Sequence, residues 1–141
     1  MAEITVPARV DCLNTVLDFI ESAARDAEID GKQRNNIKIA VEEIFVNIAS
    51  YAYPSGEGDV TVSLPRNPDK LVMEFRDSGT PYNPLAKADP DTSLSAGERE
   101  IGGLGIFMVR KMMDDVKYRY EDGKNILTIE KHIGTGGDGN A

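Results

Sequence analysis

The sequence of 141 residues has a single cysteine, Cys12, and no tryptophan. One cysteine cannot form a disulfide bond within the chain, which suits a reducing compartment. No apolar run approaches the ~20 residues that a membrane-spanning helix needs. The first residues also lack the basic segment and apolar stretch of a secretory signal. These absences predict a soluble, cytoplasmic protein that has no membrane partner.

Positive charge is scarce as well, because 16 Lys and Arg side chains stand against 24 Asp and Glu, for a net charge of −8. Phosphate backbones favour basic surfaces, so no nucleic acid partner is expected. Apolar residues make up 40% of the chain and charged residues 28%, a balance that permits a folded core. The length fits one domain, which we expect over 1–133, followed by a disordered tail over 134–141 that has nothing to bury.

The spacing of apolar residues predicts three helices and five strands. The expected helices are 9–28, 32–52 and 102–113. The expected strands are 2–7, 58–65, 71–76, 116–121 and 125–132, the last two joined by an Asp-Gly turn. In this order the helices would cover one face of the sheet. The expected fold class is therefore α+β, a two-layer sandwich with three helices on one face of a mostly antiparallel, mixed sheet.

Two polar residues lie one turn apart on the second expected helix. At ~100° per residue, Glu43 and Asn47 are neighbours and are flanked by apolar residues that include Ile39 and Val46. The adjacent Glu42 falls on the face expected to meet solvent. An amide oxygen can ligate Mg²⁺, and a carboxylate can act as a general base. Taken alone, however, the two residues favour a structural pair over a site.

Two further segments place polar or glycine residues at the ends of expected elements. Asp77 and Gly79 follow a strand, where a carboxylate can accept a hydrogen bond from an exocyclic amine such as that of adenine, and where glycine lets the backbone approach a ring. Gly102–Gly105 opens the third helix, where exposed amides can bind phosphate. Each segment alone is a common turn or cap. The glycines form neither a P-loop, since no Gly-Lys-Ser/Thr follows, nor a dinucleotide fingerprint.

Residues 80–101, between these two segments, show no periodicity and contain three prolines. A stretch of this length without regular structure is unusual inside a domain and is often functional. The features in this order indicate a nucleotide site, with a metal at 43–47, a base at 77–79, phosphates at the glycines and a lid over 80–101.

Three motifs together resemble those of the ATPase superfamily of gyrase, histidine kinases and mismatch-repair proteins. Glu43-Ile-Phe-Val-Asn47 resembles its N box, and Asp77-Ser-Gly79 and Gly103-Leu-Gly105 resemble its two glycine boxes. The resemblance extends from residue 2 to about 133. The Glu42-Glu43 pair, followed by Tyr51-Ala-Tyr53, is similar to the anti-sigma-factor serine kinases of that superfamily.

The resemblance implies a site for ATP and Mg²⁺, in which Asn47 ligates the metal and Glu43 is the catalytic base. Asp77 would recognise the adenine amine. The implied cofactor-binding residues are Asp77, Gly79, Gly103, Leu104, Gly105 and Thr128. Some family members carry an arginine before the glycines, where this chain has Ile101, and neither Arg99 nor Arg110 can be assigned in its place. This departure concerns phosphoryl transfer more than ATP binding.

The function implied by the resemblance is a partner switch. Such a kinase silences a sigma factor and phosphorylates a serine of an anti-anti-sigma protein, and it commonly acts as a homodimer. An ATP-binding module that sequesters a partner without phosphoryl transfer is the alternative. The core of a sensor histidine kinase is a third interpretation, which would need a phosphoacceptor histidine. The only histidine, His132, lies at the end of the last expected strand and is more simply a surface residue.

Overall fold

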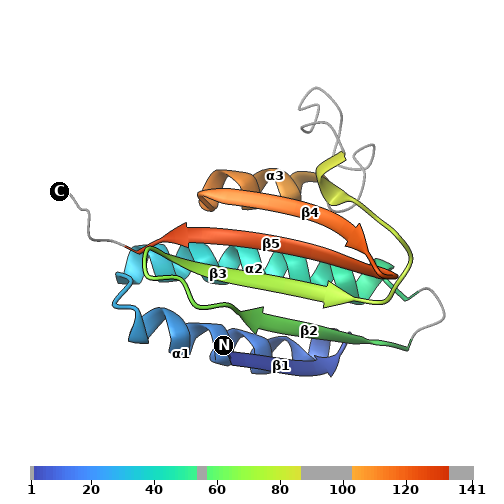
Figure 1. Cartoon of the computed structure of the whole chain (residues 1–141), viewed down its shortest axis with the longest axis horizontal. Coiled ribbons are helices and arrows are strands. Elements are labelled where there is room, and N and C mark those ends of the chain that lie inside the picture. The colour runs from blue at the N-terminus through green and yellow to red at the C-terminus, as the bar shows by residue number, and fades with distance from the viewer. Residues whose placement is uncertain (1, 54–56, 87–102, 134–141) are drawn as a thin grey trace.

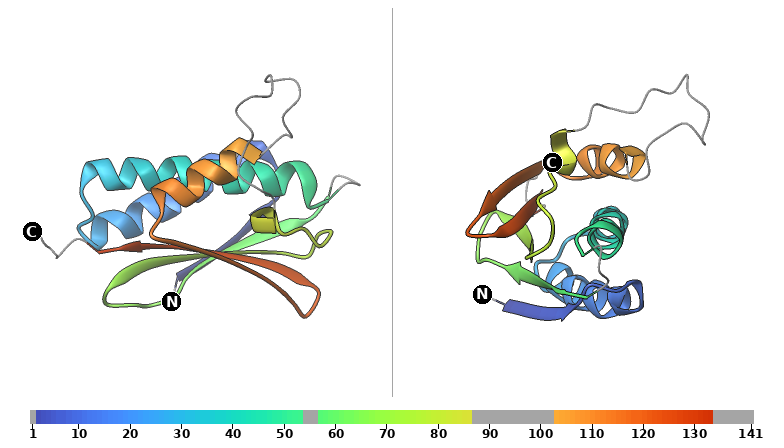
Figure 2. Two further views of the ribbon diagram at one scale, coloured as in Figure 1. Left: turned by 90° about the horizontal axis from the view of Figure 1, so that it is seen from above. Right: turned by 90° about the vertical axis from the view of Figure 1, so that its right-hand side faces the viewer.

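The structure is a computed structural model, and it describes residues 2–53, 57–86 and 103–133. In this part of the chain, three α-helices lie on one face of a five-stranded sheet (Figure 1 and Figure 2). The helices are α1 (Leu13–Asp26), α2 (Gly31–Tyr51) and α3 (Gly103–Met112). The strands are β1 (Ala2–Pro7), β2 (Asp59–Leu64), β3 (Lys70–Asp77), β4 (Asp115–Glu121) and β5 (Lys124–His132). Two short 3-10 helices, η1 (Val10–Cys12) and η2 (Pro84–Ala86), complete the description.

The strands are ordered β1-β2-β3-β5-β4, and each pairing among the described strands is antiparallel. The expected α+β sandwich is confirmed, whereas the mixed character predicted for its sheet is not found among these strands. The predicted Asp-Gly turn joins β4 and β5, with Asp122 at φ 54° and Gly123 at φ 76°. This backbone is the one that a tight hairpin turn requires. Because β5 returns beside β3, the end of β3 lies against the start of β5, with Asp77 opposite Asn125.

Local sequence explains where the helices begin. The carboxylate of Asp30 caps α2 by accepting a hydrogen bond of 2.8 Å from the backbone amide of Gln33. The first helix was expected from residue 9, but Val10–Cys12 form a 3-10 turn and α1 begins at Leu13. The signal expected to end the second helix, at 54–56, and the expected tail, 134–141, lie outside the described residues.

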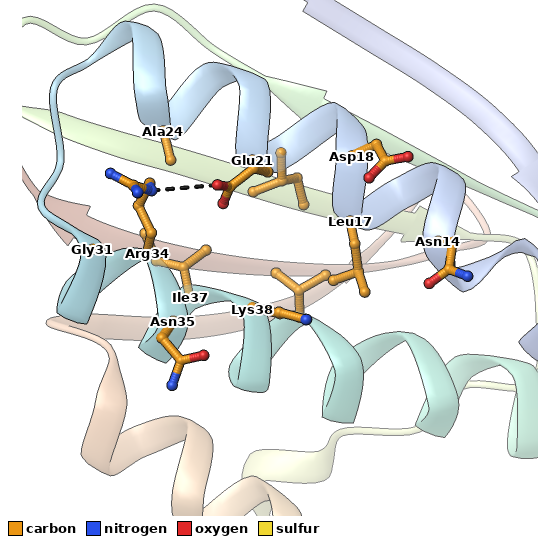
Figure 3. Close-up of a pocket in the computed structure, with 12 residues that line it drawn as sticks. Asn14, Leu17, Asp18, Glu21, Ala24, Gly31, Arg34, Asn35, Ile37 and Lys38 are labelled. Carbon is orange, nitrogen blue, oxygen red and sulfur yellow. Dashed lines mark ion pairs between the residues drawn. The ribbon is translucent and has the colours of Figure 1, made fainter.

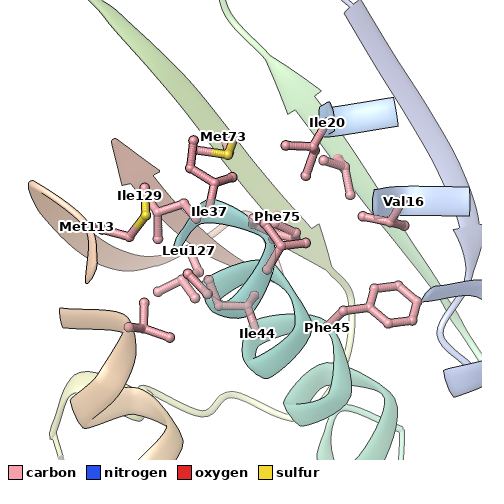
Figure 4. Packing of buried hydrophobic residues seen from close by; sticks show 14 of the residues in the cluster. Val16, Ile20, Ile37, Ile44, Phe45, Met73, Phe75, Met113, Leu127 and Ile129 are labelled. Atoms are coloured by element: carbon pink, nitrogen blue, oxygen red, sulfur yellow. The ribbon is translucent and has the colours of Figure 1, made fainter. Parts of the chain in front are cut away.

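The core lies between the helices and the sheet, as Figure 4 shows. From α2, Ile37, Ile44 and Phe45 are at most 2% exposed, and they meet Met73 and Phe75 of β3. Burying side chains of this size stabilises a fold by about 1.5–3 kcal/mol each. The side chains of α1 and α3 extend this core on either flank of α2. None of the described helices combines the length and apolar character needed to cross a bilayer.

The other face of the sheet is polar, and no described helix covers it (Figure 2). Arg76 of β3 forms an ion pair with Glu3 of β1 at 2.8 Å, across β2, and another with Glu74 of its own strand at 2.6 Å. Lys70 forms another with Glu130, at 2.8 Å. Alternation along each strand thus separates an apolar face under the helices from a charged face.

Candidate functional site

A narrow pocket opens where α2, α3 and the end of β3 meet, and it unites residues from distant parts of the sequence. Asn47, Asp77 and Asn125 are its polar side chains from α2, β3 and β5. Three tyrosines also line it, namely Tyr51, Tyr82 and Tyr118. The rings of Tyr51 and Tyr82 lie 6.2 Å apart between centroids and are inclined by 36°. An apolar and aromatic cavity with a few convergent polar groups is the usual form of a small-molecule site.

Asp77, the last residue of β3, is only 6% exposed. Its Oδ1 accepts hydrogen bonds from the backbone amide of Gly79 at 2.9 Å and from Nδ2 of Asn125 at 3.0 Å. No other described residue donates to Oδ2. Within the described residues, the one completely buried side-chain oxygen or nitrogen that lacks a partner is Oε1 of Gln33. Oδ2 of Asp77 is therefore not sealed in the protein, and it can accept a hydrogen bond from a ligand.

Gly79 lies directly against the end of α2. A Cβ atom at this position would come within 2.2 Å of the Ala52 carbonyl oxygen, which real structures do not tolerate. The same oxygen accepts a hydrogen bond of 2.8 Å from the amide of Thr80. Beside it, the hydroxyl of Tyr53 accepts from the Ser78 amide at 2.8 Å. The turn after Asp77 is thus tied to α2, which fixes the carboxylate relative to the helix.

Burial raises the pKa of two tyrosines near Asp77. It is the largest cause of the raised pKa of Tyr118, to which the negative charge of Asp77 adds, while a hydrogen bond from the Tyr82 amide acts in the opposite direction. Burial likewise raises the pKa of Tyr53. Both phenols therefore remain neutral hydrogen-bonding groups near neutral pH.

Asn47 and Glu43 lie on the flank of α2 that the helical spacing predicted, and both are half-buried. Asn47 lines the pocket, whereas Glu43, one turn earlier, is not among its lining residues. The expected contrast with Glu42 is wrong in terms of burial, because Glu42 is half-buried too. Val46, expected to shield the pair, is 36% exposed. The expected shielding of Glu43 and Asn47 by apolar residues is therefore incomplete on the side of Val46, because this part of α2 faces away from the sheet.

Gly103, Leu104 and Gly105 are the first three residues of α3. Ile106, which follows them, lines the pocket, so the first turn of this helix lies beside it. The opening turn of a helix has backbone amides without partners in the helix, and these favour anions. Further along α3, the guanidinium of Arg110 donates a hydrogen bond to the Leu85 carbonyl at 2.7 Å. Residues 87–101 of the expected lid over 80–101, which include Ile101, and Gly102 of the glycine run lie outside the described residues.

Thr128, which the resemblance places near the base, is not among the residues that line the pocket. It is three residues beyond Asn125 on β5, and side chains alternate between the faces of a strand. Thr128 consequently lies on the polar face of the sheet, where it lines a different hollow together with Glu74 and Lys117.

Asn125 is the polar pocket residue that sequence reasoning missed. It is 7% exposed and makes hydrogen bonds on both sides of its amide. No local pattern distinguishes an asparagine just after an Asp-Gly turn from an ordinary strand residue. What identifies Asn125 as a pocket residue is the pairing of β3 with β5, which places it opposite Asp77.

The donor set in the pocket fits a magnesium ion that arrives with a nucleotide. The described residues contain no group of three or more His, Cys, Asp or Glu side chains that could hold a metal by themselves. The amide of Asn47, by contrast, lines the pocket and has no hydrogen bond to another described residue. Mg²⁺ keeps several waters and often takes one or two protein oxygens together with substrate phosphates.

A separate groove lies between α1 and α2, on the other flank of α2 (Figure 3). Its volume is about 380 Å³, and Leu17 and Ile37 form part of its floor. Arg34 crosses it to pair with Glu21 at 3.3 Å. None of the predicted site residues lines this groove.

The fold and the pocket define a class: an α+β sandwich with a small pocket between its central helix, its third helix and its sheet. The chain belongs to the family of the histidine kinase-like ATPase domain, whose sequence model matches residues 6–131.

Comparisons with individual proteins agree with this family. The chain is 28% identical over 135 residues to the serine-protein kinase RsbW of Listeria innocua serovar 6a, which covers 92% of this chain and 85% of that protein. It is 24% identical over 135 residues to the serine-protein kinase RsbW of Bacillus mycoides, with 93% and 84% covered. Among solved structures, the catalytic domain of the histidine kinase ThkA matches with a TM-score of 0.55 and 14% identity, over 94% of this chain and 98% of that one. This last similarity concerns the fold alone.

Proposed function

We propose that the protein is an ATP-dependent protein-serine kinase and anti-sigma factor, which phosphorylates a serine of an anti-anti-sigma protein in a partner switch. The family and the relatives named serine-protein kinases support the class of activity. One observation of the pocket assigns the proposed activity to particular residues. Oδ2 of Asp77 and the amide of Asn47 share this pocket, and no described residue forms a hydrogen bond with either.

Each end of the site has a chemical role in this proposal. Oδ2 of Asp77 accepts a hydrogen bond from the exocyclic amine of adenine, and Gly79 lets the ring approach the backbone. The phosphates lie at the start of α3, near Gly103 and Gly105, where helix amides favour negative charge. The oxygen of Asn47 holds Mg²⁺, which neutralises phosphate charge when bound.

Glu43 is the proposed general base. It lies one helical turn before Asn47, and residues so spaced have Cβ atoms about 5–6 Å apart. Its carboxylate accepts the proton of the substrate serine as the serine oxygen attacks the γ-phosphorus. The bond between that phosphorus and the bridging oxygen of ADP breaks, and ADP leaves with the bonding electrons. The products are phosphoserine and ADP.

The pocket must widen to admit the base. Its cavity measures about 40 Å³, whereas ligand sites usually span about 300–1,000 Å³. Tyr82 and Pro84 line it from the segment after β3, outside the sheet and the long helices. Displacement of this segment is therefore the proposed first step of nucleotide binding.

The proposed partners are a sigma factor and an anti-anti-sigma protein, and the proposed assembly is a homodimer in the cytoplasm. These parts of the proposal come from the resemblance to anti-sigma-factor kinases. Cosedimentation with a candidate sigma factor, with and without ATP, tests them separately from the chemistry.

The first experiment is calorimetric titration with ATP in the presence of Mg²⁺. Wild type is expected to bind, and Asn47→Ala to lose at least about tenfold in affinity, because a hydrogen bond or ligand contact to a charged group contributes about 1.5–3 kcal/mol. Asn35→Ala is the matched control, since Asn35 is an exposed asparagine of the same helix that lines the separate groove. Failure of wild type to bind ATP would overturn the proposed function.

Formation of phosphoserine then distinguishes the kinase from its alternatives. Incubation with ATP and a candidate anti-anti-sigma protein is expected to give acid-stable phosphoserine on that protein. ATP binding with no transfer to any candidate would favour the module that sequesters a partner without phosphoryl transfer. An acid-labile phosphohistidine would favour the histidine kinase interpretation.

A further inference from the structure

Asn125 uses every hydrogen-bonding position of its side-chain amide. Nδ2 donates to Oδ1 of Asp77 at 3.0 Å and to the carbonyl of Thr80 at 2.9 Å. Oδ1 accepts from the backbone amide of Tyr82 at 3.0 Å and from the hydroxyl of Tyr118. An amide has two donor hydrogens and two acceptor lone pairs, so none is left for a ligand. Asn125 can therefore act on a ligand only through the groups that it holds.

We propose that Asn125 is a positioning residue that sets the orientation of Asp77 and thereby selects a purine with an exocyclic amine. This inference rests on the proposed function of the pocket as a nucleotide site. Nδ2 of Asn125 and the amide of Gly79 both donate to Oδ1 of Asp77. The carboxylate is held by these two bonds, with Oδ2 as the oxygen available to the base.

The selectivity follows from the charge and hydrogen-bonding character of that oxygen. An ionised carboxylate only accepts hydrogen bonds. The amine of adenine can donate to Oδ2, whereas the carbonyl of hypoxanthine at the same ring position presents lone pairs to it. Sites that pair with a polar group of the substrate reject an analogue without that group strongly, because the buried partner is left unsatisfied. ATP is therefore preferred over inosine triphosphate (ITP), which differs at this group.

Tyr118 and Tyr82 keep the amide of Asn125 in the required orientation. If the amide flipped, its oxygen would face Oδ1 of Asp77 and the carbonyl of Thr80, and its NH₂ group would face the Tyr82 amide. Three hydrogen bonds would be lost together, and only the Tyr118 hydroxyl could adapt by accepting instead of donating, so one orientation is strongly preferred.

The decisive variant is Asn125→Asp, which changes the donor to a carboxylate of nearly the same shape. Two carboxylates so close cannot both ionise without repulsion, so one of their pKa values rises. At low pH the shared proton replaces the lost hydrogen bond, and at higher pH the two charges repel and displace Asp77. Other titratable or charged groups near this pair are Tyr53, Tyr82, Tyr118, Asp59 and Lys124, whose Nζ donates to the Ser78 hydroxyl.

The experiment measures ATP and ITP affinities by calorimetry at pH 6 and pH 8. Wild type is expected to prefer ATP by at least about tenfold at both pH values, since one unmade hydrogen bond to a charged group has about that effect. Asn125→Asp is expected to lose at least about tenfold in ATP affinity at pH 8, to recover part of it at pH 6, and to discriminate less against ITP. Asn67→Asp is the control, because it makes the same chemical change in the turn between β2 and β3, where Asn67 accepts from the amide of Asp69 at 2.8 Å.

A second variant covers the case in which Asn125→Asp does not fold. Tyr118→Phe removes one donor to the Asn125 oxygen and adds no charge, and it is expected to reduce the preference for ATP over ITP about threefold. If wild type binds neither nucleotide, the proposed function fails. If wild type binds ATP but shows no preference over ITP, or if Asn125→Asp matches Asn67→Asp at both pH values, the role of Asn125 is wrong. An unchanged preference in Tyr118→Phe would overturn it as well.

Discussion

Two adjacent glutamates of α2 provide a residue-scale test of the proposed chemistry. Glu42 and Glu43 are both half-buried, so burial does not identify the base. Helical spacing does, because Glu43 shares a flank with Asn47 and Glu42 does not. A general base typically accelerates proton transfer by about 10²–10⁴-fold.

Glu43→Gln is therefore expected to reduce phosphoserine formation by about 10²–10⁴-fold, while ATP affinity changes little. Single-turnover transfer from labelled ATP measures the first quantity and calorimetry the second. Glu42→Gln is the matched control and is expected to retain activity. Loss of transfer in Glu42→Gln with normal transfer in Glu43→Gln would show that the base has been assigned to the wrong residue.

Some residues of the candidate site could be predicted from the sequence, and others could not. Asn47 and Asp77 were found because each belongs to a short motif within one element, and both line the pocket. Asn125 was missed and Thr128 was predicted instead, because only the alternation of β5 and its pairing with β3 decide which side chain meets Asp77. A site built across strands thus depends on register, and local patterns do not contain that information.

At the scale of elements, the turn after β3 connects the sheet to the end of α2. Its position depends on Gly79, since even one added carbon would meet the Ala52 carbonyl carbon at 2.6 Å and its oxygen at 2.2 Å. The turn is also held by the bond from the Thr80 amide to that oxygen. Any side chain at position 79 must push the turn after β3 away from the end of α2.

Gly79→Ala is expected to lower the free energy of unfolding by about 1–3 kcal/mol, as overpacking in other proteins does, and to weaken ATP binding because Asp77 moves with the turn. Gly31→Ala is the control: its Cβ would meet only the Arg34 guanidinium, at 3.8 Å, and alanine favours a helix over glycine by up to about 1 kcal/mol. Urea unfolding measures the free energy of unfolding of both variants. Equal stability of Gly79→Ala and wild type would contradict the close packing of this turn.

Most helix and strand boundaries were predictable because apolar spacing determines them locally. The alternation of Leu71, Met73 and Phe75 gave β3, and the Asp-Gly turn gave the hairpin of β4 and β5. The start of α1 was predicted too early, because Val10–Cys12 continue the helical spacing but form a 3-10 turn. The order of strands, which places β5 between β3 and β4, was beyond such patterns, since it depends on long-range packing.

At the scale of the whole molecule, the two faces of the sheet are held by different forces. The helices bury the apolar face, whereas the opposite face carries ion pairs that join β3 to β5 and to β1. Glu130 is the most buried acid of this polar face, at 8% exposure, and it accepts a hydrogen bond of 2.8 Å from Lys70. That bond, together with the charges of Lys70 and Lys117, outweighs the effect of burial and lowers the pKa of Glu130 below its ordinary value of 4.5.

This lowered pKa predicts a loss of stability in acid that begins around the ordinary value. The unfolded chain takes up the proton of Glu130 at a higher pH than the folded protein does. The stabilising contribution is therefore complete above about pH 5 and is lost as the pH falls through the lowered pKa. Glu130→Gln removes this titration, so the free energy of unfolding should fall less between pH 5 and pH 3 than in wild type. Urea midpoints at pH 7, 5, 4 and 3 measure the difference, with the exposed Glu121→Gln as control. Parallel curves for wild type and Glu130→Gln would mean that the ion pairs of Glu130 with Lys70 and Lys117 contribute nothing to acid stability.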